Sequence, residues 1–87
     1  MTLFHIEHKH SWDTCFAFDE SKVDLWRQVE TLALENDVIV RYFTLSPSQH
    51  VFFLLLEAPD YTSIEKVIGQ CRQLGPLTIT PVTRFGE

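Results

Sequence analysis

Residues 5–15, HIEHKHSWDTC, bring three histidines, two carboxylates and a thiol close together in the chain. Imidazole nitrogen and thiolate sulfur are ligands of zinc, copper, nickel and iron, and imidazole is also a general acid or base near neutral pH. His8 and His10 stand two positions apart, so in an extended strand they point to the same face, roughly 7 Å apart. This spacing indicates one shared site.

The first strand and the first helix must position these side chains. In residues 3–10 the set Phe4, Ile6, His8, His10 alternates with Leu3, His5, Glu7, Lys9, which is the period of a strand with one buried face. Ser21 followed by Asp24 resembles a capping box, and apolar residues then recur at helical spacing up to Asn36. We expect a helix from Ser21 onward.

The second half of the chain predicts a hairpin, a helix and a final strand. Residues 38–44 and 51–57 are rich in β-branched and aromatic side chains, and the LSPSQH segment between them favours a turn. Asp60 or Thr62 can cap a second helix that ends at Gly75 and carries Cys71 on its apolar side. Residues 77–84 form the last strand, and Pro81 within it favours an edge position.

The predicted order is βαββαβ, which is the ferredoxin-like motif. Right-handed crossovers give an α+β sandwich in which an antiparallel four-stranded sheet of order 4-1-3-2 has both helices on one face. We assign residues 1–87 to one such domain. Because residues 38–44 and 51–57 are apolar on both faces, we also predict a homodimer through the open face of the sheet.

The order 4-1-3-2 brings His50, at the start of the third strand, beside the end of the first strand. We therefore predict that His8, His10 and His50 serve as general acid or base groups, or that they bind a divalent transition metal such as zinc together with Cys15. A purely structural interpretation stays open. In it, the two histidines of the first strand are polar residues where that strand leaves the sheet, Cys15 is a small buried hydrophobe and His50 belongs to a turn.

Three further residues are predicted to contact a small-molecule ligand. Trp12 is expected in an aromatic pocket wall, although packing of the core explains it as well. Arg41, next to Tyr42 on the second strand, can hold a carboxylate with two hydrogen bonds, and an ion pair at an interface is the alternative. Asp13 is a candidate to orient one of the histidines.

Composition excludes some classes of partner. The net charge is −5 with only seven lysines and arginines, so we expect no nucleic-acid binding. The longest apolar run, residues 51–56, is too short to cross a bilayer, and the polar residues near the N-terminus do not suit a signal peptide. We therefore expect a cytoplasmic protein without membrane contact, whose two cysteines are reduced.

From Leu3 to Phe85 the element order and the two-faced strands resemble the dimeric α/β-barrel superfamily, whose ferredoxin-like domains pair sheet to sheet. HKHSWDTC is similar to the first strand and loop of short uncharacterised members, in which a histidine, an acid and a cysteine follow the strand. The resemblance implies a dimer with a small-molecule or metal site near the end of the first strand, and a monooxygenase-like or isomerase-like activity. Whether the protein is an enzyme stays open, and the alternative is a non-catalytic interaction or regulatory module that acts as a homodimer.

Overall fold

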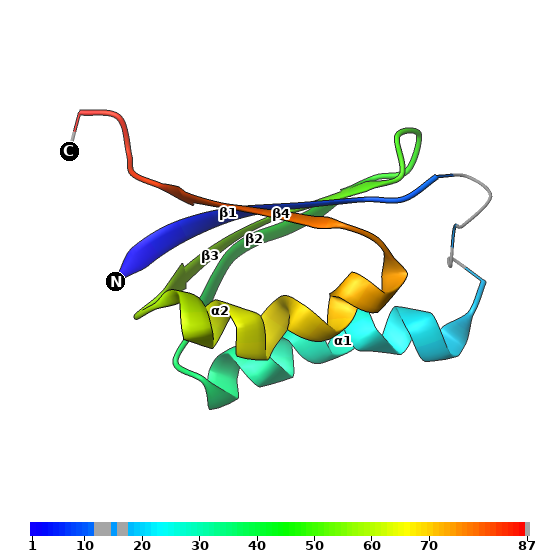
Figure 1. The fold of residues 1–87 in the computed structure, drawn as a ribbon, viewed down its shortest axis with the longest axis horizontal. Coiled ribbons are helices and arrows are strands. Elements are labelled where there is room, and N and C mark those ends of the chain that lie inside the picture. The colour runs from blue at the N-terminus through cyan, green and yellow to red at the C-terminus, as the bar shows by residue number, and fades with distance from the viewer. Residues whose placement is uncertain (12–14, 16–17, 87) are drawn as a thin grey trace.

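Four strands and two α-helices form a two-layer α+β domain in a computed structural model that describes residues 1–11, 15 and 18–86. The elements are β1 Thr2–Lys9, α1 Glu20–Glu35, β2 Ile39–Ser46, β3 Val51–Ala58, α2 Tyr61–Ile68, the 3₁₀ helix η2 Gly69–Leu74 and β4 Leu77–Val82. The strands are antiparallel and lie in the order β2-β3-β1-β4, with both α-helices on one face (Figure 1). This confirms the expected 4-1-3-2 order and is compatible with a ferredoxin-like fold.

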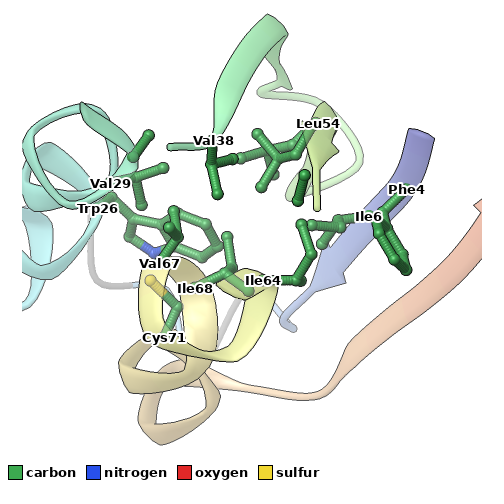
Figure 2. Packing of buried hydrophobic residues seen from close by; sticks show 13 residues of the cluster. Phe4, Ile6, Trp26, Val29, Val38, Leu54, Ile64, Val67, Ile68 and Cys71 are labelled. Atoms are coloured by element: carbon green, nitrogen blue, oxygen red, sulfur yellow. The ribbon is translucent and has the colours of Figure 1, made fainter. Parts of the chain in front are cut away.

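The core lies between the sheet and the two helices. Ile6 of β1 stands opposite Leu54 of β3 and Ile79 of β4, and opposite residues in antiparallel strands share a face. Trp26 of α1 and Ile64 of α2 cover this face of the sheet (Figure 2). Thus the even-numbered residues of β1 point toward the helices, as the alternation in the sequence predicted.

The N-cap of helix α1 lies two residues earlier than the sequence suggested. The side chain of Asp19 accepts hydrogen bonds from the backbone N–H groups of Ser21 and Lys22, so Asp19 is the N-cap and the expected start at Ser21 was wrong. Val29 and Ala33 are buried along the same side of the helix as Trp26. The helix therefore lays its apolar face on the sheet.

Helix α2 and strand β4 follow the prediction. Asp60 caps α2 through the backbone N–H of Ser63, and the chain continues as η2 until Gly75, which has φ of 146°. Pro81 lies in β4, which pairs only with β1 and is therefore an edge strand. Among the described residues, no helix is long and apolar enough to span a membrane.

A bulge in β2 changes which side chains face the helices. The register shifts between Val40 and Tyr42, so Val40 and Phe43 stand opposite the buried residues Leu56 and Leu54 of β3. Tyr42 stands opposite Leu55 on the open face instead. In a regular strand Val40 and Tyr42 would share a face, and the extra residue in the bulge puts them on opposite faces.

Candidate functional site

The end of β1 and the start of β3 meet, as the topology predicted. The backbone N–H of His10 donates to the carbonyl of His50 at 3.2 Å, one position beyond the Lys9–Val51 pair. The two imidazole rings lie 5.2 Å apart between centroids, in an edge-to-face arrangement. His50 has φ of 55°, the left-handed conformation, where it closes the turn between β2 and β3.

Cys15 joins these two histidines. One nitrogen from each ring of His10 and His50 and the sulfur of Cys15 all lie within 4.8 Å of one another. The thiol is exposed, so the interpretation of Cys15 as a small buried hydrophobe was wrong. Both histidines are half-buried. The three donor atoms therefore form a group at the edge of the sheet that an ion from solvent can reach.

These three residues also line a large cavity next to α1. The cavity has a volume of about 740 Å³. Phe18 lines the cavity from the segment just before α1. The other walls come from α1 and from the β2–β3 hairpin with its turn: Val23, Trp26, Arg27, Glu30, Phe43, Leu45, Pro47 and Phe52. Most of these side chains are apolar, so the donor group stands at the side of an apolar space.

Three aromatic rings make the floor of the cavity. Trp26 and Phe52 lie 4.4 Å apart between centroids, and Phe43 lies 5.6 Å from Phe52 and 5.8 Å from Trp26. Rings at these separations, tilted or edge to face, attract one another beyond their simple burial. The indole of Trp26 is nearly buried and packs among the core residues in Figure 2, and it also lines the cavity. The floor is consequently held in place by the core of the domain.

The surroundings of His10 favour its neutral form. Partial burial, and then the nearby imidazole of His50, lower the pKa of His10 below its ordinary value of 6.5. A neutral imidazole offers a lone pair, whereas an imidazolium offers none. The imidazole of His10 is therefore ready to act as a ligand at neutral pH.

His8 lies deeper than the sequence suggested. It shares the face and lies 5.5 Å from His10 between ring centroids, as predicted, but its side chain is fully buried and packs edge to face on Trp26 at 4.9 Å. Burial, followed by repulsion from His10, lowers the pKa of His8. His8 is not part of the group of donor atoms that His10, Cys15 and His50 form.

Arg41 and Tyr42 lie on the other side of the sheet from this group. Arg41 donates from Nη2 to Oε2 of Glu57 at 2.6 Å, and Tyr42 packs edge to face on His5 at 6.5 Å. The bulge in β2 turns Tyr42 to this side, whereas Arg41 is there because it directly follows Val40, which faces the helices. Neither residue lines the cavity. Trp12 and Asp13, for which roles were predicted, lie outside the residues that the structure describes.

Sequence reasoning did not find Phe43, Leu45 and Pro47 as walls of the site. The sequence held a signal for Leu45. It stands opposite Phe52 in the hairpin whose turn ends at His50, and residues opposite each other in paired strands share a face. Cys71, by contrast, was expected in the core. It is buried there, and burial raises its pKa to about 12, so this thiol is not a candidate ligand.

Neither protein-family models nor curated proteins give a match to this chain. The likeness to dimeric α/β-barrel proteins is thus supported at the level of a four-stranded antiparallel sheet and two helices. What the site does must be inferred from its own geometry.

Proposed function

We propose that the protein binds a divalent transition-metal ion, zinc foremost, through His10, His50 and Cys15. The observation that carries the proposal is the convergence of their donor atoms within 4.8 Å. In tetrahedral zinc sites nitrogen lies at about 2.0 Å and sulfur at about 2.3 Å from the metal, so neighbouring donors are roughly 3.3 to 3.8 Å apart. Cys15 belongs to no helix or strand, and a shift of its sulfur by about 1 Å would bring the three donor atoms to such separations.

The chemistry of the donors supports a borderline metal. Two imidazoles and one thiolate suit zinc better than the oxygen-preferring magnesium or calcium. The lowered pKa of His10 keeps one ligand deprotonated at neutral pH. Three protein ligands leave a fourth position for water or for a donor atom of a ligand, which is the arrangement of catalytic zinc sites. Metal-free acid/base use of His10 and His50 is the competing function.

Elemental analysis of untagged protein after zinc loading and desalting tests the proposal. We expect one zinc per chain, and a loss of at least tenfold in zinc affinity in His10→Ala and in His50→Asn. Asparagine is chosen at position 50 because it tolerates the positive φ of 55°, so the turn is kept while the ligand is removed. His5→Asn is the matched control, since His5 lies on β1, which leads into His10, but on the opposite face of the sheet. Equal zinc content in His50→Asn would refute this ligand set.

Chelation supplies a second readout. Zinc at 100 times its dissociation constant stabilises a folded protein by about 2.7 kcal/mol, which for a domain of this size raises Tm by roughly 10 to 20 °C. EDTA should therefore lower the Tm of the zinc-loaded protein and leave that of His50→Asn unchanged. An identical Tm with and without EDTA for the original protein would favour metal-free use of the histidines.

We also propose that a second copy of the chain covers the open face of the sheet. This face, opposite the helices in Figure 1, carries Phe53 and Leu55 of β3 together with Ile39 and Tyr42 of β2, which are 42% and 39% exposed. Charges of both signs lie among them: Glu7, Lys9, Arg41 and Glu57. A two-fold axis can set opposite charges of such a face against each other, which makes a second copy the best-fitting partner. This dimer is also what the interaction-module alternative requires.

A further inference from the structure

The cavity beside the donor group is much larger than a metal ion needs. Its volume of about 740 Å³ falls in the range of about 300 to 1,000 Å³ that is usual for small-molecule sites. A water molecule occupies roughly 30 Å³, so a metal ion with one bound water would fill only a small part of this space. The remaining volume calls for an organic occupant.

The walls indicate the shape and polarity of that occupant. Trp26, Phe43 and Phe52 present three rings with mutual centroid separations of 4.4 to 5.8 Å. Aliphatic side chains complete the space from α1 and from the hairpin, through Val23 and Leu45. A flat ring system can stack on, or stand edge-on to, such a cluster, because aromatic pairs favour these two geometries.

The charged side chains that line the cavity argue against a strongly anionic ligand. Of the described residues that line it, only Arg27 carries a permanent positive charge. Nη1 of Arg27 already donates to Glu20 and to Asp24, at 2.8 Å in each case. A phosphorylated ligand would therefore meet an engaged guanidinium, and it would also meet Glu30 on the same wall. An anionic group of a ligand can therefore bind at one place in the cavity, the metal ion proposed at His10, Cys15 and His50.

We infer that the cavity takes a small, flat, aromatic molecule with one metal-binding donor group, such as an aromatic carboxylate. The ring system would lie against Trp26, Phe43 and Phe52, and the donor group would take the fourth position of the metal. This inference rests on the proposed metal site. It adds the class of ligand that the site would bind. The ring system of that ligand supplies most of the binding affinity, and its donor group sets its orientation in the cavity.

Calorimetric titration of the zinc-loaded protein with three probes tests the inference. The probes are 2-naphthoate, acetate, which has the donor without the ring system, and 2-naphthalenemethanol, which has the ring system without the carboxylate. We expect 2-naphthoate to bind at least tenfold more tightly than either of the others. We further expect removal of zinc to weaken 2-naphthoate by about tenfold and to leave 2-naphthalenemethanol unchanged.

A wall variant separates the cavity from the metal site. Leu45 is 51% exposed on an edge strand, so Leu45→Asp should fold while placing a charge in the apolar wall. It should keep one zinc per chain and lose at least tenfold in affinity for 2-naphthoate. Leu34→Asp is the control, because Leu34 is 83% exposed on α1 and does not line the cavity. It should change neither quantity.

The outcomes distinguish the two proposals. Stoichiometric zinc with 2-naphthoate binding no tighter than acetate would overturn the ligand inference and leave the metal site standing. So would equal 2-naphthoate affinity in Leu45→Asp and in the original protein. Failure to bind zinc at all would refute the proposed function, and the metal-anchored ligand with it.

Discussion

At the scale of single residues, Gly75 and His8 fix each other's position. Gly75 has φ of 146°, and a Cβ at this position would lie 2.9 Å from Nε2 of His8 and 3.2 Å from the carbonyl oxygen of Lys9. The imidazole is buried against Trp26 and has little room to move away. The tight approach therefore ties the turn after η2 to the end of β1, which leads directly into His10.

We predict that Gly75→Ala lowers the free energy of unfolding by about 2 kcal/mol, because residues held at unfavourable φ/ψ cost about 1 to 3 kcal/mol and the new Cβ adds a contact with His8. Urea denaturation followed by circular dichroism measures the change. A double-mutant cycle with His8→Ala isolates the contact, since removal of the imidazole should relieve part of the penalty. Strictly additive effects would show that His8 and Gly75 do not constrain each other.

At the scale of elements, an ion pair ties α2 to η2. Arg72 donates to the carboxylate of Glu65, and the hydroxyl of Tyr61 donates to the same group. The hydrogen bonds from Arg72 and then from Tyr61 lower the pKa of Glu65 from 4.5 to about 2. The bonds from Arg72 span the point where the α-helical hydrogen bonding gives way to the 3₁₀ helix, so they hold the two segments as one unit.

The lowered pKa of Glu65 predicts a pH dependence of stability. Because the folded pKa lies below the unfolded value, the stabilisation is complete above pH 4.5 and disappears as the pH falls from 4.5 to about 2. The side chains of Glu65 and Arg72 are 29% and 44% exposed, so solvent screening limits the contribution to at most about 1 kcal/mol. Glu65→Gln should therefore lower Tm at pH 7. Near pH 2 the variant and the original protein should have the same Tm.

Glu35→Gln is a suitable control for that measurement. Glu35 is the last residue of α1, where a negative charge meets the negative end of the helix dipole. Its neutralisation should leave Tm at pH 7 unchanged or slightly raised. If Glu65→Gln behaved in the same way as Glu35→Gln across the whole pH range, the pair with Arg72 would contribute nothing to stability.

Local sequence signals predicted which helices and strands form better than they predicted where α1 begins or where β2 is bulged. Asp60 and Gly75 were found as the two ends of the second helical segment because caps and glycine stops act through short-range backbone geometry. The start of α1 was misplaced because Asp19 is as good a cap as Ser21, and residue type alone does not choose between them. The bulge in β2 was missed because an extra residue leaves no mark on composition, and it turned Tyr42 away from the helix side of the sheet.

At the scale of the whole molecule, topology determined what could be foreseen of the site. The meeting of His10 and His50 follows from strand order alone, because antiparallel neighbours bring the end of β1 to the start of β3. The depth of His8 does not follow from strand order. It depends on how Trp26 and the turn at Gly75 pack over the end of β1, which involves segments far apart in the chain.

Finally, the open face of the sheet predicts the mass of the protein in solution. Sedimentation equilibrium at micromolar concentrations should give twice the chain mass of 10.2 kDa. Tyr42→Lys should raise the dimer dissociation constant at least tenfold, because it removes an apolar contact and brings like charges together across the two-fold axis. Leu34→Lys, an equally drastic change at an exposed site on α1, should leave the dimer intact. A mass of 10.2 kDa over the whole concentration range would show that a second copy does not cover this face. The exposed apolar side chains would then belong to a contact with another partner.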